Sequence, residues 1–130
     1  MVSEVLSRSP IPFFYVNQVG AQNNGKNVLV FDGDTTVYEG DGTVVCRASP
    51  WKEELIPVAK APSPVSQSEI EEIYCGILTG LHHLDQIRGG GQYLVAVSGG
   101  VDSSTVAALL VQAYGPERVH AVNMLSLIHI

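Results

Sequence analysis

The sequence has few cysteines, few positive charges and no long apolar run. Its two cysteines, Cys46 and Cys75, are too few and too far apart for a disulfide framework or a metal site, so a reducing compartment is expected. No apolar segment approaches the roughly 20 residues that span a membrane, and no charged stretch followed by an apolar core marks a secretory signal. These absences predict a cytoplasmic protein with no membrane partner.

Basic residues are also scarce and scattered. The 130 residues include seven Lys and Arg against 13 Asp and Glu, which gives a formal net charge of −6. Because there is no basic stripe, nothing in the sequence supports nucleic-acid binding. A hydrophobic content of 45% is typical of a folded chain, and the length allows one small domain at most.

The first half of the chain is rich in strand signals. Strands are expected at residues 12–19, 28–31, 35–39 and 43–48. A polar loop is expected at 20–27, and Gly40-Asp41-Gly42 should form a hairpin turn because Asp and Gly tolerate positive φ. Residues 57–66 contain three prolines and no periodicity, which predicts an extended linker.

The second half has the pattern of a β-α-β unit preceded by a helix. Ser68 and Glu71 form a capping box at the start of that helix. Apolar residues then recur at helical spacing: Ile70, Ile73, Tyr74, Ile77, Leu78, Leu81 and Leu84. Three glycines at 89–91 end the helix. Residues 93–97 are apolar throughout, as in a strand that is buried on both faces. A second helix should end at Gly115-Pro116, before a strand at 119–122.

The run from Ala96 to Ser104 lies between this strand and the second helix and is the most informative part of the sequence. Gly99 and Gly100 allow positive φ and close approach of the backbone to an anion. Successive N–H groups and the positive end of the helix dipole would then attract a phosphate. Asp102 would repel a bare phosphate, and a Mg²⁺ ion that bridges the two removes this conflict.

The pattern Ser98-Gly99-Gly100-Val101-Asp102-Ser103 resembles the PP-loop of the ATP pyrophosphatases. It is neither a Walker A motif nor a dinucleotide fingerprint. The resemblance implies ATP and Mg²⁺ as cofactors, with Asp102 as the Mg²⁺ ligand. The implied ATP-binding residues are Ala96, Val97, Ser98, Gly99, Gly100, Val101, Asp102, Ser103 and Ser104. A Gly-Gly turn with a Ser or Asp helix cap is the structural alternative.

Two stretches of the first half are similar to the end of nitrilase-type amidases: residues 15–20, Tyr-Val-Asn-Gln-Val-Gly, and residues 30–33, Val-Phe-Asp-Gly. A nitrilase-like domain followed by a PP-loop domain resembles the family of glutamine-dependent NAD synthetases. The implied fold is α/β: the end of a nitrilase-type αββα sandwich, then the first β-α-β unit of a PP-loop parallel sheet, truncated at both ends. The implied domains are an amidase part (1–55), a linker (56–67) and a synthetase part (68–124).

The resemblance implies a ligase that forms NAD from deamido-NAD, with ATP and with ammonia from glutamine, through an adenylated intermediate. The whole enzyme is expected to be a homo-oligomer. Its amidase Glu, Lys and Cys should lie upstream, so no catalytic residue is assigned here. Cys46 and Cys75 are expected to be small buried hydrophobes. His82 and His83 are expected to be surface or rim residues rather than a metal pair, and His120 is expected to be packed rather than a ligand.

Two alternatives to this function stay open: another PP-loop amidotransferase such as GMP synthetase, or an ATP-binding module without ligase activity. The similarity of the first half to nitrilases argues against GMP synthetase. The last six residues, 125–130, read Leu-Ser-Leu-Ile-His-Ile, which one reading frame of a transposase library adapter encodes. We expect this tail not to belong to the native protein; a genuine apolar strand is the alternative.

Overall fold

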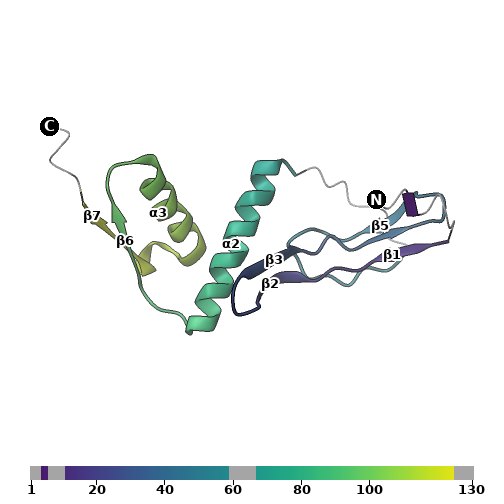
Figure 1. The fold of residues 1–130 in the computed structure, drawn as a ribbon, viewed down its shortest axis with the longest axis horizontal. Helices are drawn as coiled ribbons and strands as arrows, with labels where there is room; N and C mark the ends of the chain where they lie inside the picture. Colours follow the sequence, from purple (N-terminus) through teal and green to yellow (C-terminus); the bar gives the residue numbers. More distant parts are fainter. Residues whose placement is uncertain (1–3, 6–10, 59–66, 125–130) are drawn as a thin grey trace. The chain divides into compact units, whose positions relative to one another are not determined.

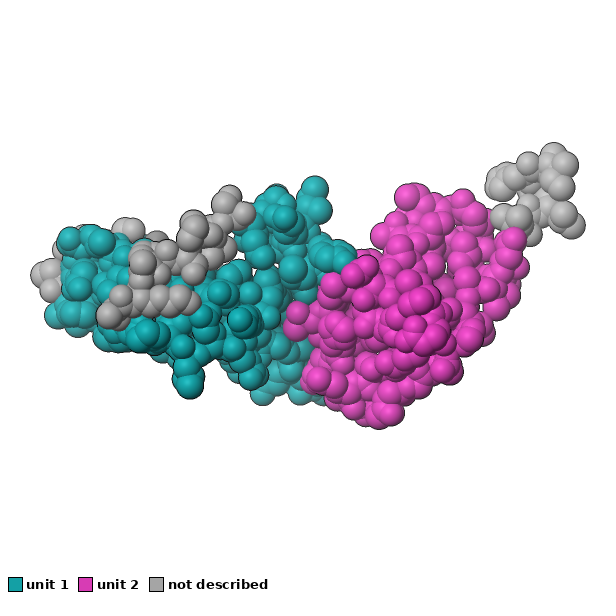
Figure 2. Space-filling model, turned by 180° about the vertical axis from the view of Figure 1, so that it is seen from behind, with its two compact units in different colours: residues 1–76 teal, residues 77–130 magenta. Residues whose placement is uncertain are grey.

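The computed structural model describes residues 4–5, 11–58 and 67–124, and the chain forms two compact units, residues 1–76 and 77–130 (Figure 2). The first unit is mainly β and the second is α/β. Each unit contains its own paired strands. No helix among the described ranges is long and apolar enough to cross a membrane. The predicted division into an amidase part, a linker and a synthetase part concerns the whole protein and stays a prediction.

The described residues of the first unit form five short strands in two antiparallel sheets (Figure 1). These are β1 (Phe13–Tyr15), β2 (Val19–Asn23), β3 (Val28–Asp32), β4 (Thr36–Tyr38) and β5 (Val44–Arg47). Strand β4 lies between β1 and β5, while β2 and β3 form a separate hairpin. The buried side chains belong to the three-stranded sheet and its end: Thr36, Val37, Cys46 and Ala48. The fully buried Cys46 confirms its predicted role as a small core residue.

The hairpin formed by β4 and β5 confirms the prediction from its Asp-Gly turn. The Glu39 N–H donates to the Thr43 carbonyl at 2.8 Å, and the Gly42 N–H donates to the Glu39 carbonyl at 2.9 Å. The Asp41 carboxylate accepts a hydrogen bond from the Thr43 N–H at 2.8 Å, and this bond lowers the pKa of Asp41. The turn is therefore stabilised by local contacts of the kind that a sequence motif encodes.

The predicted single strand at 12–19 is wrong, because the chain breaks between Tyr15 and Val19. At this break the Asn17 N–H donates to the Thr35 hydroxyl at 3.1 Å, and the Asn17 side-chain amide donates to Asp32 at 3.1 Å. These bonds replace a strand ladder and let the chain pass from one sheet to the other. The predicted loop at 20–27 is also too long, since β2 continues to Asn23.

Helix α2 (Glu69–Arg88) begins in the first unit and ends in the second. The capping box is present: Glu71 accepts from the Ser68 N–H at 2.7 Å, and the Glu71 N–H donates to the Ser68 hydroxyl at 3.3 Å. The Ser68 hydroxyl also donates to the Glu71 carboxylate at 2.9 Å, and the bonds from the Ser68 N–H and hydroxyl to this carboxylate lower the pKa of Glu71. At the other end the chain leaves the helix through Gly89, which has a φ of +73°. Both predicted ends of this helix are confirmed.

The second unit is the predicted β-α-β unit. Strand β6 (Tyr93–Val97) leads into α3 (Val101–Tyr114), the short 3₁₀ helix η1 (Pro116–Arg118) and β7 (Val119–Asn123). Strands β6 and β7 are parallel, with Tyr93 opposite Val119 and Val97 opposite Asn123. The expected burial of β6 on both faces is wrong for this chain: Val95 is buried, but Leu94 is 74% exposed. Among the described residues only β7 pairs with β6, and α3 packs against this pair.

Candidate functional site

The loop from Ser98 to Gly100 connects the carboxyl end of β6 to the first residue of α3. Gly99 has a φ of +85°, a conformation that side chains other than glycine rarely adopt. Gly100 is extended, with φ −81° and ψ 158°, and occupies the N-cap position of α3. The expectation of positive φ therefore holds for Gly99 and not for Gly100. A Cβ on Gly100 would meet only the Ser98 Oγ, at 3.6 Å, so the fold itself does not require glycine there.

Hydrogen bonds of serine hydroxyls stabilise the turn between β6 and α3. The hydroxyls of Ser103 and Ser104 donate to the Gly100 carbonyl at 3.1 and 2.9 Å. The Ser98 N–H donates to the Ser103 Oγ at 3.3 Å. Because these hydroxyls bind a carbonyl of the loop, they order it around the start of the helix.

The start of α3 presents backbone N–H groups that no side chain caps and that are able to bind an anion. The first N–H groups of an α-helix have no partner within the helix, and no side chain caps them here because the N-cap residue is Gly100. The helix dipole adds a partial positive charge at the same end. Gly99, Gly100 and Asp102 are exposed, so a ligand can reach this end of the helix from solvent. Such an arrangement is suited to a phosphate group.

Asp102 is the one acidic residue in the first turn of α3. In residues 4–5, 11–58 and 67–124 no group of three or more His, Cys, Asp or Glu could hold a metal ion by itself. Mg²⁺ commonly binds one or two carboxylates and completes its coordination with substrate phosphates and water. A single exposed carboxylate next to an uncapped helix start fits that mode of binding.

A second group of side chains, which the sequence did not predict, lies at the opposite ends of β6 and α3. The rings of Tyr93 and Tyr114 stack with their centroids 4.1 Å apart. The Tyr93 hydroxyl donates to Asp85 at 2.6 Å, and Arg118 binds both oxygens of that carboxylate. Arg118 and, less strongly, Tyr93 lower the pKa of Asp85, while the hydrogen bond to Asp85 raises the pKa of Tyr93 to about 12.

The remaining candidate side chains do not form a site. Cys75 is half-buried on α2. His82 is exposed, with its ring edge-on to Tyr114 and the ring centroids 6.4 Å apart, while the neighbouring His83 is partly buried. Both positions agree with the predicted surface or rim placement. The packed position predicted for His120 is wrong, because its side chain is exposed and hydrogen-bonds to Gln92 at 2.8 Å.

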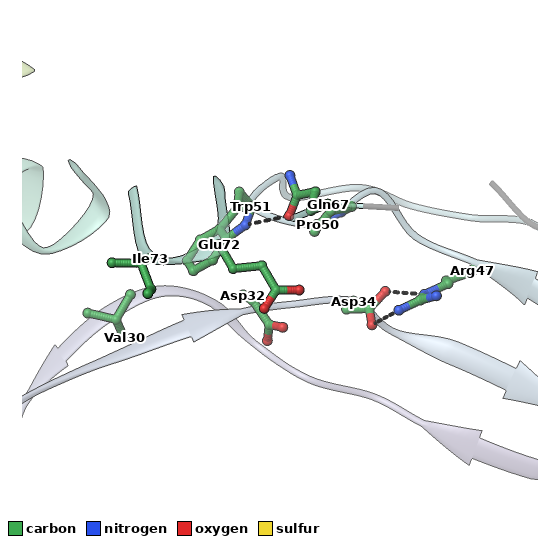
Figure 3. Close-up of a pocket in the computed structure, with 9 residues that line it drawn as sticks. All are labelled: Val30, Asp32, Asp34, Arg47, Pro50, Trp51, Gln67, Glu72 and Ile73. Carbon is green, nitrogen blue, oxygen red and sulfur yellow. Dashed lines mark hydrogen bonds and ion pairs between the residues drawn. The ribbon is translucent and has the colours of Figure 1, made fainter. Parts of the chain in front are cut away.

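A cavity of about 350 Å³ lies in the first unit (Figure 3). It is lined by Val30, Asp32, Asp34, Arg47, Pro50, Trp51, Gln67, Glu72 and Ile73. Arg47 forms a two-point ion pair with Asp34, and the Trp51 indole donates to Gln67 at 3.1 Å. The lining contains neither cysteine nor lysine, so it does not offer the nucleophile of an amidase.

Comparisons with known proteins agree with the similarity predicted from the motifs. Residues 78–128, which include the loop at Ser98–Ser104, match the family model for NAD synthase. The glutamine-dependent NAD(+) synthetase of Synechocystis sp. is 28% identical, over 95% of this chain and 23% of that protein. The same enzyme of Acinetobacter baylyi is 29% identical, over 95% of this chain and 24% of that protein.

A solved structure gives the same result. It is the glutamine-dependent NAD⁺ synthetase of Acinetobacter baumannii in complex with ADP, with a TM-score of 0.77 and 32% identity over 95% of this chain and 24% of that one. The chain therefore resembles these enzymes along nearly all of its length and spans about a quarter of theirs. The family match continues through residues 125–128, outside the described residues, and the predicted boundary at 124 stays a prediction.

Proposed function

We propose that this chain is part of a glutamine-dependent NAD synthetase and that its Ser98–Ser104 loop binds the phosphates of ATP. One observation carries the proposal: the uncapped start of α3, at the carboxyl end of a parallel strand, lies inside the segment similar to NAD synthase. Open α/β sheets bind their ligands at this end of the strands. The ADP in the similar Acinetobacter baumannii structure supports an adenine nucleotide as the ligand.

The whole enzyme would convert deamido-NAD to NAD in two stages. ATP first adenylates the nicotinate carboxylate of deamido-NAD, and pyrophosphate leaves. Ammonia released from glutamine then attacks the acyl carbon, AMP leaves, and the amide forms. Negative charge develops on the leaving pyrophosphate in the first stage, and preorganised N–H donors stabilise such charge. The N–H groups at Gly99, Gly100 and the start of α3 are suited to this role.

Asp102 is the residue that we assign to Mg²⁺. Its carboxylate is exposed in the first turn of α3, beside the N–H groups that would attract phosphate. The ion, when bound, supplies charge neutralisation of the pyrophosphate and orients it for departure. Asp102 would hold the ion, and the N–H groups would hold the phosphate oxygens that complete its coordination.

The hydrolysis of glutamine is assigned to residues of the whole protein outside this chain. Cys46 is fully buried, and Cys75 is a half-buried residue of α2, so neither is placed as an amidase nucleophile. We expect the whole enzyme to be a cytoplasmic homo-oligomer, and we expect the 130-residue chain alone to show neither glutaminase nor synthetase activity.

The test uses the whole protein that contains this sequence, with deamido-NAD and Mg²⁺-ATP as substrates. With either glutamine or ammonium as nitrogen donor it should form NAD, and AMP and pyrophosphate should appear in equal amounts. Asp102→Asn should lower NAD formation with either donor by about 100-fold or more, the range in which a preorganised contact to developing charge contributes. Glutamine hydrolysis should continue at least in part, because it uses a separate site.

Glu117→Gln is the matched control, because Glu117 is an exposed acid beyond the opposite end of α3. It should keep near-normal activity. If Asp102→Asn forms NAD from ammonium at the normal rate, Asp102 is not the metal ligand. If the unchanged protein forms no NAD from deamido-NAD with either donor, the proposed function is wrong.

A further inference from the structure

Tyr93 and Tyr114 are in contact at the ends of β6 and α3 that lie farthest from the Ser98–Ser104 loop, which is called the phosphate loop below. Strand β6 runs from Tyr93 to the loop, and α3 runs from the loop to Tyr114 (Figure 1). The two rings stack nearly parallel, with an angle of 12° between their planes. The loop thus connects the near ends of strand and helix covalently, and the stacked rings connect their far ends.

Polar contacts fix this pair of rings in place. The Arg118 guanidinium lies 5.6 Å from the centre of the Tyr93 ring and 5.5 Å from that of Tyr114. Arg118 also binds Asp85 through two nitrogens and donates to the Gly91 carbonyl at 3.0 Å. The Tyr114 hydroxyl donates to the Leu81 carbonyl at 2.7 Å. The stack is therefore tied to the last turns of α2 and to η1.

Helix α3 also packs against both strands of the parallel pair, β6 and β7. Among the described residues of the second unit, Val95 and Tyr114 are the buried side chains. In the middle of α3 the side chains of Ala107, Leu109 and Leu110 are half-buried, and Ala108 is exposed. Tyr114 is the buried side chain of α3 in the described residues, so a displacement of the helix along the strand would disturb the Tyr93–Tyr114 stack directly.

We propose that Tyr93 and Tyr114, held by Asp85 and Arg118, are positioning residues for the phosphate loop. The stack sets how far α3 extends toward the loop, and so places the N–H groups at the helix start and the Asp102 carboxylate relative to Ser98. Hydrogen bonds lose strength within a few tenths of an ångström, so a small displacement weakens several of them at once. The inference rests on the proposed function, because it concerns the binding of ATP by that loop.

The test compares Tyr114→Leu with Tyr114→Phe in the whole protein. Leucine keeps an apolar side chain but removes the stack, whereas phenylalanine keeps the ring and loses only the hydrogen bond to Leu81. The KM for ATP and the kcat are measured with ammonium as nitrogen donor, well below the melting temperature of each variant. Thermal melting of each variant is recorded separately.

Tyr114→Leu should raise the KM for ATP about tenfold, a fraction of the ~100-fold that a misplacement of ~1 Å can cause. Tyr114→Phe should stay within about twofold of the unchanged protein, even where its melting temperature falls. A purely structural role would lower the melting temperature of Tyr114→Leu and leave its KM for ATP unchanged, and that result overturns the inference.

If Tyr114→Leu does not fold, Arg118→Lys is the variant in which the KM for ATP is measured instead. Lysine keeps the charge but cannot bind Asp85 at two points. It should raise the KM for ATP several-fold, and an unchanged KM overturns the inference. An unchanged protein that makes no NAD contradicts the proposed function, whereas a normal KM for ATP in both substituted proteins contradicts only the positioning role.

Discussion

Alanine substitutions at Gly99 and Gly100 should both weaken ATP binding, but only the substitution at Gly99 should clearly lower the stability of the fold. Gly99 has a φ of +85°, so Gly99→Ala forces a side chain into the left-handed region at a cost of about 1–2 kcal/mol. Gly100 has a φ of −81°, which alanine adopts without strain, and its new Cβ would lie 3.6 Å from the Ser98 Oγ. That distance is an ordinary van der Waals contact.

For Gly100→Ala, two small terms oppose each other in the free energy of unfolding. The unfolded chain loses conformational freedom, which stabilises the fold by roughly 0.4–1 kcal/mol. Alanine is a poorer N-cap residue than glycine, which destabilises the helix by a comparable amount, on the order of 0.5 kcal/mol. The net change should stay within about 1 kcal/mol of zero, so glycine is present at this position for a reason other than stability.

That reason, on the proposed function, is close approach of phosphate to the start of α3. A methyl group at Gly100 would displace the phosphate from one charge-assisted hydrogen bond, which contributes about 1.5–3 kcal/mol. This free energy corresponds to a loss of roughly 10- to 150-fold in ATP affinity. Gly99→Ala should instead lower the free energy of unfolding, with a loss of affinity that follows from the distorted turn.

The assay is calorimetric titration with Mg²⁺-ATP, together with denaturant unfolding of each substituted whole protein. Gly100→Ala should show near-normal unfolding and weak ATP binding. Normal ATP affinity in Gly100→Ala would refute the reasoning, because the backbone at the helix start would then not be the anion-binding surface. Strong destabilisation by Gly100→Ala would show instead that the fold itself needs glycine there.

Two further predictions concern stability. Arg118 and Tyr93 lower the pKa of Asp85, so their bonds to its carboxylate stabilise the fold fully above the unfolded-state pKa of about 3.9, and this stabilisation is lost as the pH falls through the lower folded-state value. The free energy of unfolding is measured in denaturant at several pH values for the unchanged protein and for Asp85→Asn. The difference between the two should be constant from about pH 5 to pH 8 and shrink below about pH 4. Gly33 has a φ of +79°, and a Cβ there would lie 2.5 Å from a methyl group of Val19, so Gly33→Ala should destabilise by about 2 kcal/mol or more in the same measurement. Gly25→Ala is its control, with similar φ and open space around it, and equal losses for both would show that the contact with Val19 has no effect.

The sequence by itself determined the elements whose signals are local. The capping box of Ser68 and Glu71, the glycines that end α2, and the strand, glycine turn and helix around Ser98–Ser104 lie in the structure where their motifs predict. Each depends on contacts within a few residues, such as the bonds from Ser103 and Ser104 to the Gly100 carbonyl. The phosphate-binding role of that loop remains a prediction from its motif and geometry.

Only the tertiary structure decided the features that depend on residues far apart in the chain. The strand expected at 12–19 breaks because Asn17 bonds to Thr35, 18 residues away, and no local pattern encodes that partner. The cluster at the far ends of β6 and α3 joins Asp85 to Arg118 across 33 residues. Such pairs cannot be predicted from a single sequence, because the sequence does not show whether an aspartate or an arginine is solvated or paired with a distant residue. Their partners are set by how the helices and strands pack, and packing is a property of the whole fold.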